Sequence, residues 1–251
     1  MATAKTEIEW SYSPVDFFEA THRRETVDYT LVADAGKVLV ALTAPSDPID
    51  VELQKRIRKD VENLFRLQQL LVHRPFQVDE PAKVCQHGTD GRKSIFVTLR
   101  GVVLLMGPVH LRIQIPHDAS GKLIKDTKAE RIAEHTKFIN SVMPKVGSSP
   151  TLNALLGSYN AAVNHPANEL GYLYEICDAL TMHYGTMHKA LRKLPSIGQD
   201  WNRLGYLANK APLKEGRHGG LHLKLRHASE AELDEARKIA RRLIEAFSNQ
   251  L

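Results

Sequence analysis

The first 45 residues alternate apolar and polar positions in two short runs. The runs cover residues 26–32 and 37–42, and the Gly-containing segment 33–36 joins them. Alternation with a period of two is typical of a strand with one buried face, and a short Gly-containing connection favours antiparallel neighbours. The pattern therefore predicts a β-hairpin.

From residue 49 to 72 the apolar positions recur near the helical period, and Ser46 or Asp47 can cap the start. The recurring residues are Val51, Ile57, Val61, Leu64, Phe65, Leu67 and Leu71. We expect one long helix that lies across a sheet.

Strand-like segments return at residues 93–99, 101–106 and 109–115, separated by turn signals. Near the N-terminus, Trp10, Tyr12, Phe17 and Phe18 cluster around Ser13-Pro14. These aromatic residues could form a binding lip, but a plug that covers the sheet is favoured because aromatic side chains supply much of the burial in a core.

Beyond residue 126 the strand pattern disappears and helical windows follow one another. They cover residues 127–143, 151–163, 167–184, 187–193, 199–210 and 229–247, and Ser229-x-x-Glu232 is a capping box at the last of them. The predicted fold class is α+β, with an N-terminal antiparallel sheet and one long helix followed by an all-α helical bundle. We place the sheet domain at residues 1–122, a linking helix at 123–149 and the bundle at 150–251.

The composition is that of a globular protein, with 43% hydrophobic and 25% charged residues. No apolar run approaches the roughly 20 residues of a membrane helix, and the N-terminus lacks a secretory signal pattern. Cys85 and Cys177 lie far apart without ligand spacing. We expect a cytoplasmic protein with two buried, reduced thiols, no membrane partner, no metal and no cofactor.

Positive charge gathers at the C-terminal end. Residues 183–251 hold thirteen Lys/Arg and seven Asp/Glu, whereas the whole chain has a net charge of only +5. Such a segment indicates either an anionic partner, most commonly nucleic acid, or a solvated face.

The segment 209–222 carries the strongest chemical signal. It is basic and Gly-rich, and it joins two predicted helices. Histidine transfers protons near neutral pH and arginine holds phosphate oxygens, so these residue types together suit a phosphodiester. Motifs of P-loop, dinucleotide-binding, zinc-protease and serine-hydrolase sites are absent from the sequence.

Within this segment Arg217 and His222 form the spacing Arg-x-x-x-x-His. Through this motif, residues 150–251 resemble the HEPN superfamily of helical domains. The resemblance implies a metal-independent ribonuclease that works as a homodimer. In it, the RNA 2′-hydroxyl attacks the adjacent phosphate, His222 takes the acid/base role and Arg217 stabilises the phosphate. An acidic residue on an earlier helix commonly contacts the motif, and Glu175 or Asp178 occupies the matching position.

Other residues of the basic segment are candidates for RNA binding. These are His218, Arg203, Asn209, Lys214, Lys224 and Arg226. A structural interpretation of the motif residues stays open, with Arg217, Glu175 and Asp178 in salt bridges and His222 solvated.

The sequence thus predicts a HEPN-type endoribonuclease in a defence or toxin role, with the N-terminal domain as a sensor or protein-docking module. One alternative is a catalytically silent HEPN-like module that binds RNA or a protein. Another is a small-molecule enzyme with a pocket between its two domains.

Overall fold

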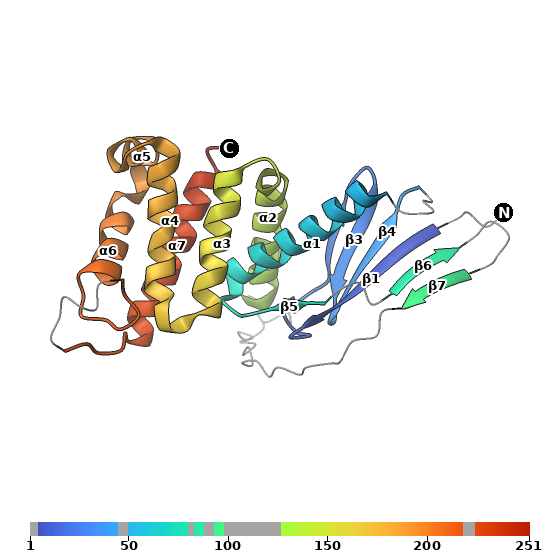
Figure 1. Cartoon of the computed structure of the whole chain (residues 1–251), viewed down its shortest axis with the longest axis horizontal. Coiled ribbons are helices and arrows are strands. Elements are labelled where there is room, and N and C mark those ends of the chain that lie inside the picture. The colour runs from blue at the N-terminus through green and yellow to red at the C-terminus, as the bar shows by residue number, and fades with distance from the viewer. Residues whose placement is uncertain (1–4, 45–49, 80–82, 88–92, 98–126, 218–223) are drawn as a thin grey trace, which may run out of the picture. The chain divides into compact units, whose positions relative to one another are not determined.

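The computed structural model describes residues 5–44, 50–79, 83–87, 93–97, 127–217 and 224–251. An antiparallel sheet is followed by a helical region, which confirms the α+β class (Figure 1). The chain forms two compact units, which we call the sheet unit (residues 1–68 and 76–140) and the helical unit (69–75 and 141–251). The range 123–149, expected to be a linking helix, contains α2 (Thr127–Val146), whose residues are shared between the two units.

The sheet has the strand order β2-β3-β4-β1-β6-β7, with β5 paired to β1. The strands are β1 (Lys5–Ser13), β2 (His22–Glu25), β3 (Tyr29–Asp34), β4 (Lys37–Leu42), β5 (Gln77–Val78), β6 (Lys83–His87) and β7 (Lys93–Val97). The predicted hairpin is confirmed as β3–β4, and its two-residue turn has positive φ at Ala35 and Gly36. Positive φ at both central positions gives a turn that matches the twist of paired strands.

One face of the sheet is buried, as the alternation predicts. Leu31, Ala33, Val38 and Val40 are fully buried. The helix α1 (Val51–Val72) buries the apolar face that its period predicts, and the Tyr29 hydroxyl on β3 donates to Asp60 on this helix. The expectation that the long helix lies across the sheet is thereby confirmed.

The aromatic cluster near the N-terminus is part of the core. Trp10, Tyr12, Phe17 and Phe18 are all buried, and the Phe17 ring stacks on Phe65 of α1 at 5.5 Å between centroids. This confirms the plug and excludes a binding lip. Of the later predicted strands, the one at 93–99 is β7, whereas those at 101–106 and 109–115 lie outside the described residues.

The helical unit is built mainly from α3 (Pro150–Asn164), α4 (Glu169–Tyr184), α6 (Gly198–Asn209) and α7 (Glu230–Ser248). The shorter α5 (Met187–Lys193) follows α4, and the 3-10 turns η1 (Pro166–Asn168) and η2 (Pro195–Ile197) precede α4 and α6. The helices α3, α4 and α7 pack side by side (Figure 1). The capping box at Ser229 and Glu232 is confirmed.

One predicted helix boundary is wrong. The helical window predicted from the sequence ends at residue 143, directly before Pro144, yet α2 continues to Val146 with Pro144 inside it. Val142, Met143 and Val146 are all buried, so packing of the last turn outweighs the hydrogen bond that proline removes.

Both cysteines are buried free thiols, and burial raises the pKa of the Cys177 thiol. Within the described part of the chain, no helix is both long and apolar enough to span a bilayer.

A buried ionic network ties α4 to its neighbours in the helical unit. Glu169, the first residue of α4, is 2% exposed and accepts two hydrogen bonds from Arg237 of α7, at 2.6 and 3.0 Å. Nε2 of His73 lies 3.2 Å from the same carboxylate, and its Nδ1 lies 3.0 Å from the Tyr159 hydroxyl. Burial would raise the pKa of Glu169, but the hydrogen bonds from His73 and Arg237 outweigh it and the pKa is lowered.

Removing the arginine of this network is expected to destabilise the helical unit strongly. Arg237→Ala leaves a buried carboxylate without its main partner, which costs about 3–5 kcal/mol. Urea denaturation followed by circular dichroism measures the loss. The control is Lys238→Ala on the same helix, because its partner Asp234 is exposed and such a pair contributes about 0–1 kcal/mol. Equal effects of the two substitutions would contradict the assignment.

The network also predicts a pH dependence of stability. The folded-state pKa of Glu169 lies below its unfolded value of about 4.3, so the ionised carboxylate stabilises the fold fully above that pH. This contribution is lost as the pH falls through the lower folded pKa. We expect the stability gap between wild type and Glu169→Gln to be largest at pH 7 and to shrink below pH ~4, as measured by urea denaturation at each pH. A gap that stays constant would exclude this role for Glu169.

Candidate functional site

The connector between α6 and α7 is closed at its base by backbone hydrogen bonds. Lys214 donates its amide to the Arg226 carbonyl and Arg226 donates to the Pro212 carbonyl, each at 3.0 Å. The Arg217 amide donates to the carbonyl of Ala208 in α6 at 2.7 Å. A Cβ at Gly216 would lie 2.8 Å from that same carbonyl oxygen, so the close approach requires glycine.

The Arg217 side chain lies along one face of α4. Gly171, Tyr174 and Asp178 share this face because they are spaced three and four residues apart. Nη1 of Arg217 donates to Asp178 at 2.6 Å, and the guanidinium carbon lies 5.5 Å from the Tyr174 ring centroid. A Cβ at Gly171 would meet Cγ of Arg217 at 3.2 Å. Each part of the Arg217 side chain therefore meets a residue on α4. Its aliphatic stem passes Gly171, its charge pairs with Asp178, and its guanidinium lies by the Tyr174 ring.

The structure separates the two acidic candidates. Asp178 contacts Arg217, whereas Glu175 accepts from the Ser158 hydroxyl of α3 at 3.4 Å. Of the two carboxylates at the matching position, Asp178 is thus the one brought to the motif arginine. His222 and His218 lie outside the described residues.

Two of the proposed RNA-binding arginines are held by carboxylates of α7. Arg203 donates two hydrogen bonds to Glu235, at 3.0 and 2.7 Å, and Arg226 donates two to Glu232, at 2.7 and 2.6 Å. A phosphate would have to compete with these paired contacts, which lowers the suitability of both residues for RNA binding.

The remaining candidates have different surroundings. Asn209 ends α6 and hydrogen-bonds the Tyr174 side chain, while burial raises the pKa of that phenol. Lys214 Nζ lies 3.2 Å from Nε2 of His227, and Lys224 is exposed. Asn209 and Tyr174 therefore connect α6 to the Arg217 site.

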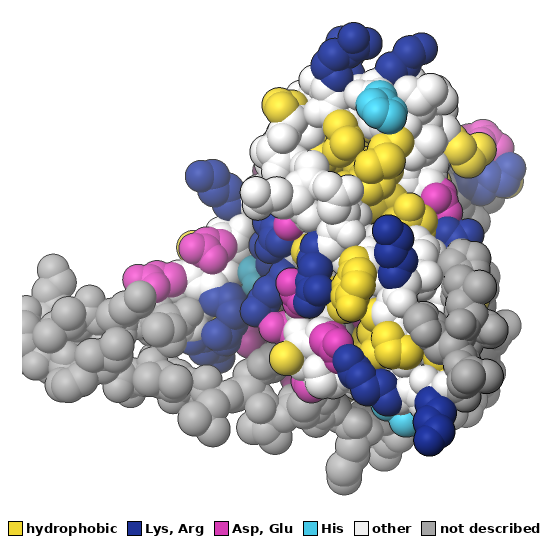
Figure 2. All heavy atoms as spheres, turned by 90° about the vertical axis from the view of Figure 1, so that its left-hand side faces the viewer, with side chains coloured by type: hydrophobic (Ala, Val, Ile, Leu, Met, Phe, Trp, Pro, Cys, Tyr) yellow, Lys and Arg dark blue, Asp and Glu magenta, His cyan; other side chains and the backbone are white. Residues whose placement is uncertain are grey.

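The basic segment does not form a uniform positive surface. Besides the pairs above, Arg237, Lys238, Arg241 and Arg242 each pair with a carboxylate. Figure 2 shows basic side chains interleaved with acidic and hydrophobic ones on the face that it presents. The net positive charge of the segment 183–251 thus overstates the positive electrostatic potential that an anionic partner would meet at its surface.

A buried carboxylate that the sequence pattern did not single out lies two residues before Arg217. Glu215 is 7% exposed and accepts from Nδ1 of His227 at 2.8 Å and from the Ala228 amide at 2.9 Å. Burial would raise the pKa of Glu215, but these hydrogen bonds outweigh it and the pKa is lowered. Neither residue belongs to a periodic pattern or a known spacing, so the sequence offered no signal for the pair.

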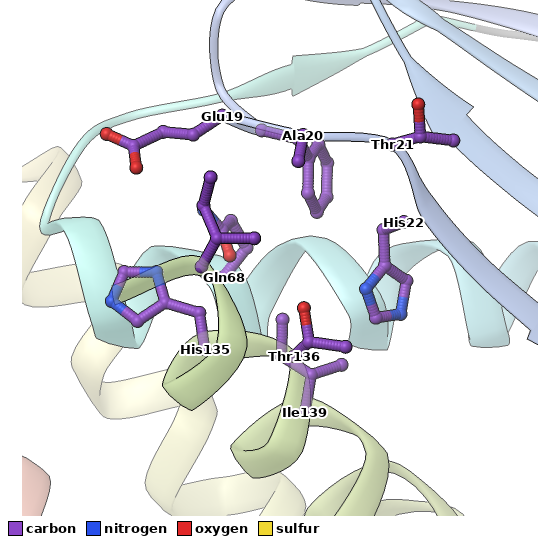
Figure 3. Close-up of a pocket in the computed structure, with 10 residues that line it drawn as sticks. Glu19, Ala20, Thr21, His22, Gln68, His135, Thr136 and Ile139 are labelled. Carbon is purple, nitrogen blue, oxygen red and sulfur yellow. The ribbon is translucent and has the colours of Figure 1, made fainter. Parts of the chain in front are cut away.

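A small polar pocket lies in the sheet unit between the β1–β2 connection, α1 and α2 (Figure 3). Its volume is about 20 Å³, which is room for a single water. His22 and His135 lie on opposite sides of it, and burial together with the charge of Arg24 lowers the pKa of His22. The pocket is too small to accept an organic substrate.

Comparison of the chain with protein-family models, with curated proteins and with solved structures found no match. Among the described residues no three His, Cys, Asp or Glu side chains gather as metal ligands.

The geometry predicts that the Tyr174 ring restrains Arg217. Tyr174→Leu removes the planar surface beneath the guanidinium and should speed rotation about its Nε–Cζ bond, whereas Tyr174→Phe keeps the ring and should retain slow rotation. Nuclear magnetic resonance of the Arg217 Nε–H group measures this rotation, with Tyr172→Leu as the control on the same helix. Identical rotation rates in all three variants would show that the ring does not restrain Arg217.

Proposed function

We propose that the helical unit is a metal-independent endoribonuclease of the HEPN type. The observation that carries the proposal is the placement of Arg217 against Asp178, because an acidic residue on an earlier helix commonly contacts the motif in that family. The Asp178 hydrogen bond uses Nη1 of Arg217. The Nε–Nη2 edge of the guanidinium remains suited to hold two oxygens of one phosphate.

The proposed reaction is an internal transfer at phosphorus. The RNA 2′-oxygen bonds to the adjacent phosphorus, the bond from phosphorus to the 5′-oxygen breaks, and one product ends in a 2′,3′-cyclic phosphate. Arg217 stabilises the charge that builds on the phosphate oxygens, and His222 takes the acid/base role implied by the resemblance. Asp178 holds the Arg217 guanidinium in place, so little conformational entropy is lost when the arginine binds the RNA phosphate.

In this proposal the protein is cytoplasmic, acts on RNA as a homodimer and serves in defence or as a toxin, as the resemblance implies. The sheet unit is then a sensor or a docking module for a protein partner. The main competitor is a silent module that binds RNA or a protein through the same connector without turnover.

Cleavage of total and transfer RNA in EDTA tests the proposal. Wild type should produce fragments ending in 2′,3′-cyclic phosphate, and Arg217→Ala should lower the rate by about 10²–10³ because a donor to the transition state is lost. His222→Ala should lower it by about 10²–10⁴, the usual contribution of a general acid or base.

The two acidic residues supply a matched pair of variants. Asp178→Asn should lower the rate by about fivefold, because the partly exposed ion pair that it weakens is worth up to ~1 kcal/mol, while Glu175→Gln should leave the rate unchanged. Absence of cleavage by wild type, with RNA affinity that falls as salt rises, would favour the silent module instead.

A further inference from the structure

The neck of the α6–α7 connector carries a histidine, His227, in addition to Arg217. The neck consists of residues 213–217 and 226–228, which are joined by the Leu213–Arg226 bridge and its flanking hydrogen bonds. The Arg217 side chain extends from the neck toward α4. Glu215, two residues earlier, contacts His227 in the segment 226–228 that leads into α7. The arginine and this histidine therefore stand on the same closed backbone frame.

The contacts of His227 fix which ring nitrogen carries a hydrogen. A carboxylate with a lowered pKa only accepts hydrogen bonds, so Nδ1 of His227, 2.8 Å from Glu215, must be the donor. Nζ of Lys214 lies 3.2 Å from Nε2, and an ammonium group only donates. Both contacts are satisfied together when the ring is neutral with its lone pair on Nε2.

This arrangement is that of an oriented base. Glu215 is 7% exposed whereas the His227 side chain is 73% exposed, so a buried carboxylate holds an imidazole that is largely open to solvent. An exposed histidine contributes little to stability, yet its orientation is controlled from the interior. A base within reach of substrate and oriented by a third group is the pattern of nucleophile activation in hydrolytic sites.

We propose that His227 is a catalytic base that removes the proton from the RNA 2′-hydroxyl, with Glu215 as its positioning residue. This inference rests on the proposed ribonuclease function. Nε2 of His227 takes the hydroxyl proton as the 2′-oxygen bonds to phosphorus, the bond to the 5′-oxygen breaks, and that oxygen takes its proton from the acid. The acid role is the part that the proposed function leaves to His222.

The charges around His227 suit this role. Glu215 and Lys214 contact the His227 ring from the segment 213–217 of the neck. Arg226, which precedes His227 in the chain, donates to the His227 carbonyl, and its charge is paired with Glu232 of α7. Lys214 occupies Nε2 only through an exposed contact, so an incoming phosphate can draw the ammonium away and free the lone pair. Glu215 then stabilises the imidazolium that forms.

The test compares wild type, His227→Gln and Glu215→Gln in the cyclic-phosphate assay across pH 5–9. His227→Gln should lower kcat by about 10²–10⁴ with little change in KM, and the decline of kcat on the acidic side of the profile should disappear. Glu215→Gln should lower kcat by about tenfold. His188→Gln, an exposed histidine on α5, is the control and should match wild type.

Chemical rescue separates a base from a merely structural residue. Imidazole added to His227→Gly should restore cleavage in proportion to its neutral form, and His227→Gln should melt at the same temperature as wild type. Glu215→Gln removes a buried charge and can unfold the neck, so the His227 variants carry the test. If His227→Gln cleaves RNA as fast as wild type, or if imidazole does not restore cleavage by His227→Gly, this inference is wrong while the proposed function stands. An inactive wild type overturns the proposed function together with it.

Discussion

The enclosure of α4 by its neighbours is the constraint on which the helical unit depends. This helix packs against α3, α5, α6 and α7, and its Leu170, Leu173, Ile176, Cys177 and Leu180 are fully buried. Its first residue, Glu169, is fixed by Arg237 and His73. With those faces occupied, the row Gly171, Tyr174 and Asp178 is where the connector can lie. The position of Arg217 therefore follows from the packing of the bundle rather than from the connector itself.

Much of the fold could be predicted from the sequence because apolar residues recur at a regular spacing within each of its helices and strands. The β3–β4 hairpin, the long α1 and the helices from α3 to α7 each carry apolar residues at a regular period, and a capping box marks the start of α7. The continuation of α2 through Pro144 could not be predicted, because it depends on the burial of Val142, Met143 and Val146 in the folded protein. At Pro144 the local preference of proline is to end the helix, whereas tertiary packing favours its continuation, and packing is stronger.

The candidate site could be predicted only in part. The spacing around Arg217 and the acidic helix were visible in the sequence, and the structure brings Arg217 and Asp178 together. Which of Glu175 and Asp178 would face the arginine depends on the exact rotation of α4 against the connector, which no pattern encodes. Pairs such as Arg203–Glu235 and Glu215–His227 join residues 32 and 12 positions apart, and isolated polar residues have no period to reveal their partners. The same pairs explain why a basic sequence segment does not amount to a basic surface.

The closed neck of the connector has an evolutionary consequence. Because Lys214 and Arg226 join the two ends through backbone hydrogen bonds, the chain between them is a loop whose ends are already fixed. The entropy of closing such a loop grows only slowly, by about 0.6 kcal/mol for each doubling of length. Insertions between Arg217 and Arg226 therefore cost the bundle little stability, so recognition sequences can be added there while the neck that carries Arg217 and His227 stays the same.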